Sequence, residues 1–232
     1  AGKKSKKKAP AKESLHASII THFDPKSPVA EAYRGIRTNI NLSTIDEDLK
    51  TILISSPGPG EGKTTTISNL AITFAKLGRK TLVVDCDLRK PRIHTVFGLK
   101  NNSGLLQVFT AEEEINPLEL VNAVKDIENL YVLTSGGIPA NPSELLGSKK
   151  MKKIIRTLRE QYDVLLFDTP PFTAVTDPIM LAKEMDTNIL VVKAGETNKK
   201  AFYRSIQNLD QVKVQPSGVI LNWLTKSTSH DS

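Results

Sequence analysis

The sequence predicts an α/β fold, a doubly wound and mostly parallel sheet with helices on both faces. Three observations lead to this prediction. Short runs of apolar and β-branched residues alternate with segments whose apolar residues recur at helical spacing. The strand candidates are apolar throughout, which is typical of parallel strands covered on both sides. A glycine-rich loop, residues 57–65, joins the first strand to the first long helix.

Local signals place the first elements. Ser27 and Pro28 predict a helix start, because a capping hydroxyl precedes a proline at the first helical position. Residues 51–56 are a short apolar run that predicts a buried strand. After the glycine-rich loop, a helix ends near Gly78 and a second strand covers residues 80–87. These segments predict a β–loop–α–β unit.

The same alternation continues to the end of the chain. Its least regular part, residues 88–129, predicts one or two short helices joined by loops. Beyond it, we expect strands at 129–135, 163–168, 187–193 and 218–222, separated by helices at 143–162, 177–185 and 199–209.

Composition predicts one folded domain with short extensions. The 232 residues are 39% hydrophobic, which is enough for a core of ordinary size. No run approaches the roughly 18 apolar residues of a membrane span. The single cysteine, Cys86, cannot form an internal disulfide, so a reducing cytoplasmic setting fits best. We expect a basic, disordered arm at 1–23, the domain at 24–224 and a C-terminal tail at 225–232.

The net charge of +7 comes from the arm. Of the 32 basic residues, six are lysines within residues 1–12, which leaves 26 against 25 acidic residues elsewhere. A solvated arm is the simplest interpretation. The alternative is attraction to an acidic partner or to anionic lipid, at about 1 kcal/mol per lysine. Nucleic acid is the least favoured partner, because no aromatic residues accompany the charge.

The glycine-rich loop predicts a phosphate-binding site. Gly58, Gly60 and Gly62 allow the backbone to approach a phosphate closely, and the following helix N-terminus favours negative charge. Lys63 can reach the β and γ phosphates, and the Thr64 hydroxyl can bind Mg²⁺.

Three carboxylates are predicted to converge near this loop. Asp85 and Asp87 stand two residues apart at the end of one strand, and Asp168 ends another apolar strand. Ligands of open parallel sheets bind at the carboxyl ends of the strands. Each acid alone could cap a helix, but the three together indicate a nucleoside triphosphate with Mg²⁺.

The three motifs resemble the Walker A, A′ and B motifs of the bacterial protein-tyrosine kinases (BY-kinases) of capsule and exopolysaccharide operons, which are P-loop ATPases related to MinD and ParA. The first is the loop at 57–65, which departs from the strict pattern at Pro57. Residues 85–89 (DCDLR) match D-x-D-x-R, and residues 168–171 match D-T-P-P. The resemblance covers roughly residues 24–224.

Two further segments resemble the same family. One is TSGGIPANPSELL at 134–146. The other is Glu31, Arg34 and Arg37, which fit the E-x-x-R-x-x-R motif that the resemblance assigns to subunit contacts in a ring. On a helix, residues three apart form a slanting stripe. Spacing alone favours a solvated charged face for them.

The resemblance implies an ATP-dependent protein-tyrosine kinase that uses ATP and Mg²⁺. It places Mg²⁺ at Thr64, Asp87 and Asp168. In the transfer itself, Lys63 would hold the phosphates with Asp87 beside them, Asp85 would accept the tyrosine proton, and Arg89 would stabilise transferred charge or steer an acidic tail. The residues expected to line the nucleotide are Gly58, Gly60, Glu61, Gly62, Lys63, Thr64, Thr65 and Asn222. Asn222, at the end of the last strand, is expected beside the adenine, and the alternative is an ordinary polar residue at the start of a loop.

The resemblance also implies partners. They are a transmembrane activator whose cytoplasmic tail completes the nucleotide site, other copies of the chain in a ring, and tyrosine-rich tails as substrate. The protein is expected in the cytoplasm, recruited to the inner face of the cell membrane. This chain has four tyrosines and none near Ser232, so the usual tyrosine cluster is missing.

Two alternatives remain open at this point. The first is a switch ATPase of the ParA or MinD type, although those proteins carry a signature lysine five residues before the phosphate lysine, where this chain has Gly58. The second is a nucleotide-dependent ring scaffold without enzymatic activity.

Overall fold

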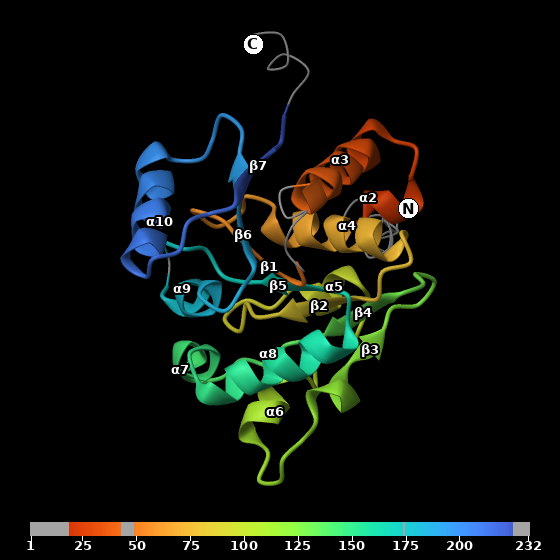
Figure 1. Ribbon diagram of the computed structural model, residues 1–232, viewed down its shortest axis with the longest axis vertical. Coiled ribbons are helices and arrows are strands. Elements are labelled where there is room, and N and C mark those ends of the chain that lie inside the picture. Colours follow the sequence, from red (N-terminus) through yellow and green to blue (C-terminus); the bar gives the residue numbers. More distant parts are fainter. Residues whose placement is uncertain (1–18, 43–48, 174, 225–232) are drawn as a thin grey trace, which may run out of the picture.

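The computed structural model describes residues 19–42, 49–173 and 175–224, and in these residues seven strands form one sheet (Figure 1). The strand order is β3-β4-β2-β5-β1-β6-β7. Neighbouring strands run parallel, except that β3 is antiparallel to β4. The strands are β1 Thr51–Ser55, β2 Thr81–Asp85, β3 Asn122–Ala123, β4 Leu130–Leu133, β5 Val164–Asp168, β6 Thr187–Lys193 and β7 Gly218–Asn222.

Helices cover both faces of the sheet (Figure 1). One layer holds α2 Ile20–Phe23, α3 Pro28–Leu42, α4 Lys63–Ala75 and α5 Ile93–Val96. The other side holds α6 Leu105–Thr110, the 3₁₀ helix η1 Pro117–Leu120, α7 Pro142–Leu146, α8 Lys149–Gln161, α9 Asp177–Ala182 and α10 Lys199–Gln211. This is the predicted doubly wound arrangement.

The central strand β1 shows why both faces need cover. Its side chains alternate, so Ile52 and Ile54 belong to the core beneath α4, while Leu53 belongs to the core beneath α8. All five β1 residues are buried. A strand that is apolar on both faces is stable only between two helical layers.

Capping side chains set two helix starts. Ser27 Oγ accepts the N–H of Ala30 at 3.2 Å, which confirms the predicted start of α3. The helix expected at 143–162 is instead two helices, α7 and α8. The second begins after Ser148, whose Oγ accepts the N–H of Met151 at 3.1 Å and caps the new helix.

Two other expectations change in detail. Residues 88–129 contain α5, α6 and η1, and also the short strand β3, which was not expected. The described structure also includes residues 19–23, which the sequence predicted as part of the arm. Ile19 is buried, and Thr21 donates its N–H and its hydroxyl to Asn69 Oδ1 at 3.0 and 2.9 Å, which fastens α2 to α4. The rest of the predicted arm, 1–18, and the tail, 225–232, lie outside the described residues.

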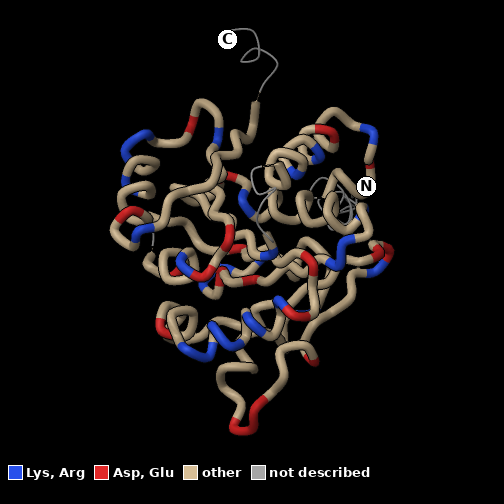
Figure 2. The backbone as a smooth tube through the Cα atoms, in the orientation of Figure 1, with Lys and Arg blue, Asp and Glu red and all other residues tan. Residues whose placement is uncertain are grey.

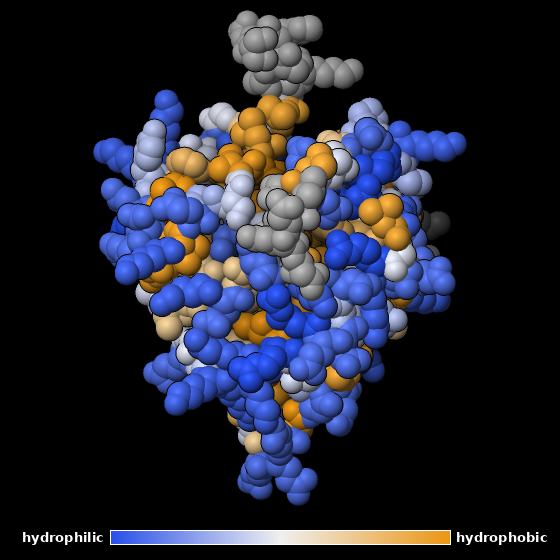
Figure 3. All heavy atoms as spheres, in the orientation of Figure 1, coloured by the Kyte–Doolittle hydropathy of each residue, from blue (hydrophilic) through white to orange (hydrophobic). Residues whose placement is uncertain are grey.

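The described surface is mixed in charge. Figure 2 shows both signs interspersed over the elements, with basic residues repeated along α8. The face seen in Figure 3 is largely hydrophilic, and hydrophobic side chains gather near the end of β7. Val219, Leu221 and Leu224 are each about half exposed there. Within the residues that the structure describes, none of the helices has the length and apolar character that a membrane crossing needs.

Candidate active site

The phosphate loop lies between β1 and α4, at the carboxyl end of the sheet. Gly60 and Gly62 have φ angles of 77° and 87°, which side-chain-bearing residues rarely adopt. Gly62 is the N-cap residue of α4, and no side chain caps this helix start. Thr65 lies half-buried in the first turn. The helix therefore presents its positive end where the sequence predicted phosphate.

Asn222 packs against this loop from the end of β7. Its Nδ2 donates to Glu61 O at 3.2 Å. A Cβ built on Gly62 would lie 2.2 Å from that Nδ2, so any larger residue here would displace the Asn222 side chain from this contact. Asn222, the residue predicted to contact the adenine, therefore lies against the phosphate loop and hydrogen-bonds to its backbone.

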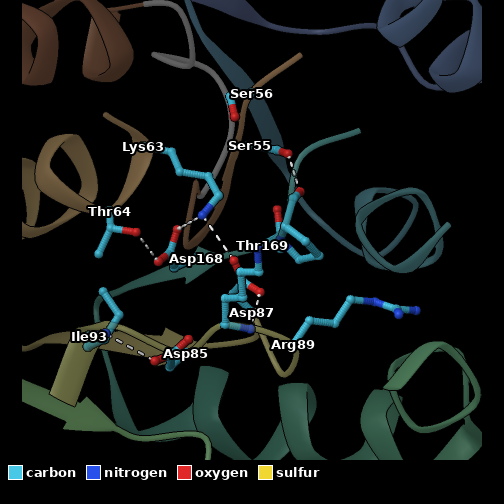
Figure 4. A network of polar contacts seen from close by, with 12 residues as sticks. Ser55, Ser56, Lys63, Thr64, Asp85, Asp87, Arg89, Ile93, Asp168 and Thr169 are labelled. Carbon is cyan, nitrogen blue, oxygen red and sulfur yellow. Dashed lines mark hydrogen bonds and ion pairs between the residues drawn. The ribbon is translucent and has the colours of Figure 1, made fainter. Parts of the chain in front are cut away.

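Three carboxylates meet opposite Lys63 (Figure 4). Strands β2 and β5 are neighbours and pair Asp85 with Asp168 in register. Lys63 Nζ lies 3.1 Å from Asp87 Oδ2 and 3.7 Å from Asp168 Oδ1. The lysine side chain is 13% exposed, and the Asp87 and Asp168 side chains are 7% and 1% exposed. This is a buried cluster with more negative than positive charge.

Burial is the largest cause of the raised pKa values of Asp168 and Asp85. It raises the pKa of Asp168, against the opposing effect of Lys63 and of the Thr64 hydrogen bond. Burial and the neighbouring Asp168 raise the pKa of Asp85 well above its ordinary value. Burial alone would lower the pKa of Lys63, but Asp168 and Asp87 outweigh it and raise that pKa.

The donor set fits a magnesium ion. Thr64 Oγ1 donates to Asp168 Oδ2 at 2.8 Å, so both predicted ligands already lie side by side. Asp168 Oδ1 is buried and has no hydrogen-bond partner among the described residues. A hydroxyl and carboxylates are the oxygen ligands that Mg²⁺ takes, usually with several waters retained. Thr64, Asp87 and Asp168 are therefore the residues that would hold it.

Asp85 lies deeper than the other two acids. It is fully buried, and its Oδ2 accepts the N–H of Ile93 at 3.1 Å. Its Oδ1 has no hydrogen-bond partner among the described residues. Asp85 therefore has one acceptor oxygen available and a raised pKa, but the surrounding chain covers it.

Arg89 lies beside the carboxylate cluster and pairs with an acid that its spacing in the sequence did not indicate. Its guanidinium points away from Lys63 and Asp168 in Figure 4. Arg89 Nε donates to Asp177 Oδ2 at 2.8 Å, and its Nη2 donates to Asp177 Oδ1 at 3.2 Å. Ser143 also donates to Asp177, which is fully buried. The arginine side chain remains 41% exposed beside the site rather than inside it.

Glu61 makes contacts that its loop position did not predict. Its Oε1 accepts the N–H of Gly58 at 3.0 Å. Its Oε2 accepts the N–H of Lys193 at 2.9 Å and the hydroxyl of Thr197. Lys193 is the last residue of β6 and Thr197 lies in the turn after it, and both are far from the loop in sequence. No spacing in the sequence links them to the loop.

The side chains of the charged stripe on α3, Glu31, Arg34 and Arg37, already make hydrogen bonds within the chain. Arg34 Nε donates to Glu31 Oε2 at 2.8 Å, and Arg34 Nη1 donates to Pro25 O at 2.8 Å. Arg37 Nη1 donates to Thr73 O at 2.8 Å, near the end of α4. Arg37 therefore joins two helices, while Glu31 and Arg34 remain at the surface.

Sequence reasoning missed Asp177, Ser143, Lys193 and Thr197. An acid followed by proline, as at Asp177, is an ordinary helix start and does not mark a partner for Arg89. A threonine after a strand, as at Thr197, is equally common in loops. These four residues acquire their roles only through contacts between distant segments.

The phosphate loop before α4, the carboxylates after β2 and at the end of β5, and the parallel sheet define a P-loop nucleotide-binding protein. The family described as "AAA domain" matches residues 49–217. Tyrosine-protein kinase YwqD of Bacillus subtilis (strain 168) is 41% identical over 208 residues, which cover 90% of this chain and 86% of that protein. The chain belongs to this AAA-domain family and, within it, to the bacterial tyrosine-protein kinases.

Solved structures agree. The crystal structure of the chimerical protein CapA2B2 has a TM-score of 0.85 and 38% sequence identity, with 90% of this chain and 91% of that chain covered. The septum site-determining protein MinD of Pyrococcus horikoshii OT3, complexed with Mg-ADP, has a TM-score of 0.62 and 25% identity, with 75% and 70% covered. MinD therefore shares the fold at lower sequence identity and coverage.

Proposed function

We propose that this chain transfers the γ-phosphoryl group of ATP to tyrosine hydroxyls and thereby acts in capsule or exopolysaccharide synthesis. The observation that carries the proposal is Lys63, the first residue of α4 within the phosphate loop, which lies between Asp87 and Asp168. Family membership supports the same activity.

The position of each residue in the site indicates its proposed role. Amides of the loop and of the α4 N-terminus bind phosphate oxygens, and Lys63 leaves its carboxylate partners to contact the β and γ phosphates. Thr64, Asp87 and Asp168 would hold Mg²⁺, which would supply positive charge to neutralise the phosphates. Both cofactor assignments, ATP and Mg²⁺, rest on this donor set.

In the transfer step, the tyrosine oxygen forms a bond to the γ phosphorus while the bond from that phosphorus to the β,γ-bridging oxygen breaks. ADP leaves with the electron pair of that bond. The proposed acceptor of the phenolic proton is Asp85, whose Oδ1 is unpartnered among the described residues. A carboxyl with a raised pKa is a better base once ionised, and contacts with substrate often tighten only in the complex.

The proposed substrate is a tyrosine-rich tail, phosphorylated between subunits of a ring. Three of the four tyrosines support this: Tyr33 and Tyr162 are buried, and Tyr131 lies within β4. The fourth, Tyr203, is 65% exposed on α10 and is the tyrosine of this chain most open to labelling. Arg89, 41% exposed beside the cluster, is suited to steer an acidic tail. Glu31 and Arg34 at the surface of α3 are proposed as the ring contact.

The proposed partner is a transmembrane activator that recruits the chain to the inner face of the cell membrane. An apolar groove of 410 Å³ between α3 and the end of β7 supports a docked tail. Its lining includes Val29, Leu221 and Trp223, and it reaches Asn222 at the nucleotide loop. A tail seated there would complete the nucleotide site.

The experiment uses radiolabelled ATP with Mg²⁺ and a peptide bearing a tyrosine cluster. We expect phosphotyrosine on the peptide and little label on this chain itself, and we expect Lys63→Met to abolish transfer. Lys152→Met is the matched control, since Lys152 only pairs with Glu184 on the surface. Hydrolysis without phosphotyrosine would favour the switch ATPase, and neither activity would favour the scaffold. Strong labelling of Tyr131 or Tyr162 would contradict the tail as substrate.

A further inference from the structure

The phosphate loop is joined to the segment after β6 through one side chain. Glu61 is 6% exposed, and its two carboxylate oxygens accept donors from three residues. One donor, the N–H of Gly58, belongs to the loop itself. The others, the N–H of Lys193 and the hydroxyl of Thr197, belong to the end of β6 and the turn that follows it.

A second contact reinforces the same junction. The backbone carbonyl of Glu61 accepts the Asn222 side chain from β7. The residue thus receives donors on its carboxylate and on its main chain from three separate segments. Because hydrogen bonds to an ionised carboxylate are stronger than neutral ones, these contacts hold the loop in one conformation.

The loop conformation needs such support. Gly60 and Gly62 flank Glu61 with positive φ angles, and glycine has more freedom to leave any one conformation than other residues. Without an external tie, the amides around Glu61 would sample other orientations. Binding phosphate would then require them to be ordered first, at a cost in affinity.

We propose that Glu61 is a positioning residue that holds the phosphate-loop amides ready for the nucleotide by tying them to the end of β6 and the turn that follows it. Glu61 acts through the backbone of Gly58 and through its own main chain rather than by touching phosphate. This inference rests on the proposed function for the identity of the ligand, ATP.

The same segment carries a matched control. Glu196 lies in the turn after β6, pairs with Lys193 Nζ at 2.7 Å and is 66% exposed at its side chain. Lys193 thus donates its main-chain N–H to Glu61 and its side chain to Glu196. Glu196→Gln removes a carboxylate from the same neighbourhood without touching the phosphate loop.

The test measures binding of ATP and of ADP by calorimetry, on the full chain with Mg²⁺ and well below the unfolding temperature. Glu61→Gln keeps the side-chain size but removes the charge and one acceptor oxygen. We expect both nucleotides to bind about tenfold to a hundredfold more weakly, the range for one or more charge-assisted hydrogen bonds. Thr197→Val, which removes one donor, should produce a smaller loss in the same direction. Glu196→Gln should bind as the parent does.

Binding separates this inference from the proposed kinase activity. If the parent binds ATP without phosphorylating tyrosine, and Glu61→Gln weakens that binding, the positioning role stands while the proposed function fails. A purely structural Glu61 would lower the unfolding temperature of Glu61→Gln without changing the Kd for ATP. That result, or an equal loss in Glu196→Gln, would overturn the inference.

Discussion

Lys63 is expected to stabilise the fold as well as to bind phosphate, because its ammonium group compensates buried carboxylates. In Lys63→Met, Asp87 and Asp168 would lose the cation that lies 3.1 and 3.7 Å from them. Methionine fills much of the same volume, so the change is mainly one of charge. The variant should therefore be less stable than the parent in the absence of nucleotide.

The size of the effect follows from burial. All three side chains are 13% exposed or less. Removing one partner of a buried ion pair typically costs about 3–5 kcal/mol, because the remaining charge is left uncompensated. For a domain of this size, that loss lowers the unfolding temperature by about 6–20 °C. An exposed pair such as Lys152 with Glu184 should contribute no more than about 1 kcal/mol, so Lys152→Met is the control.

The effect should depend on pH. Burial raises the pKa of Asp168 and of Asp85 above the value in the unfolded chain, and Lys63 opposes this rise. Without Lys63 both pKa values rise further. A carboxyl with a raised folded-state pKa destabilises the fold most above that pKa, and the penalty shrinks as pH falls and the folded carboxyl takes up its proton. The loss should be larger at about pH 7.5 than at about pH 5.

Urea unfolding of the parent and of Lys63→Met at both pH values measures the loss in free energy of unfolding. Asp168→Asn should restore part of the stability in the double variant with Lys63→Met, because it removes one of the uncompensated charges. A parent-like free energy of unfolding for Lys63→Met at neutral pH would refute the reasoning. So would a loss that is equal at both pH values and unaffected by Asp168→Asn.

Two further predictions concern the loop and the assembly. Gly62→Ala should weaken ATP binding by tenfold or more, because its Cβ would meet Asn222 Nδ2 and its φ of 87° is strained for alanine. Adding Asn222→Ala should recover only part of the lost affinity. Parent-like ATP binding by Gly62→Ala would contradict the close packing. Gly35→Ala is its control in calorimetry, since nothing lies within 4 Å of that added Cβ. Replacing Glu31, Arg34 and Arg37 by alanine should shift an oligomeric parent to monomers in light scattering. The Arg37→Ala single variant measures separately the stability lost with the hydrogen bond from Arg37 to Thr73. An unchanged mass of the triple variant would show that the stripe is a solvated face and not a subunit contact.

Much of the fold could be predicted because it is encoded locally. The apolar run of β1 and the hydroxyl of Ser27 act within a few residues of their own position, so periodicity and capping rules detect them. The break between α7 and α8 could not be predicted as easily. Ser148 is a cap only because the chain turns there, and the same serine fits a helix surface.

The sequence alone determined which residue types stand at the carboxyl end of the sheet, namely the phosphate-loop glycines, Lys63 and the three aspartates. The tertiary structure alone decided how they face one another. Lys63 contacts Asp87 and Asp168, whereas Asp85 accepts a backbone amide from Ile93. Side chains just beyond a strand follow the path of the next loop, which no periodicity records.

Long-range partners show the same limit. The position of Arg89 two residues after Asp87 predicted that it lies beside the acids. Its guanidinium instead pairs with Asp177, a buried residue at the start of α9. Glu61 could be predicted as a loop residue, but its donors Lys193 and Thr197 come from the end of β6 and the turn after it. Local sequence encodes local backbone and burial. The pairing of charged and polar side chains across the sheet depends on which segments the packed core brings together.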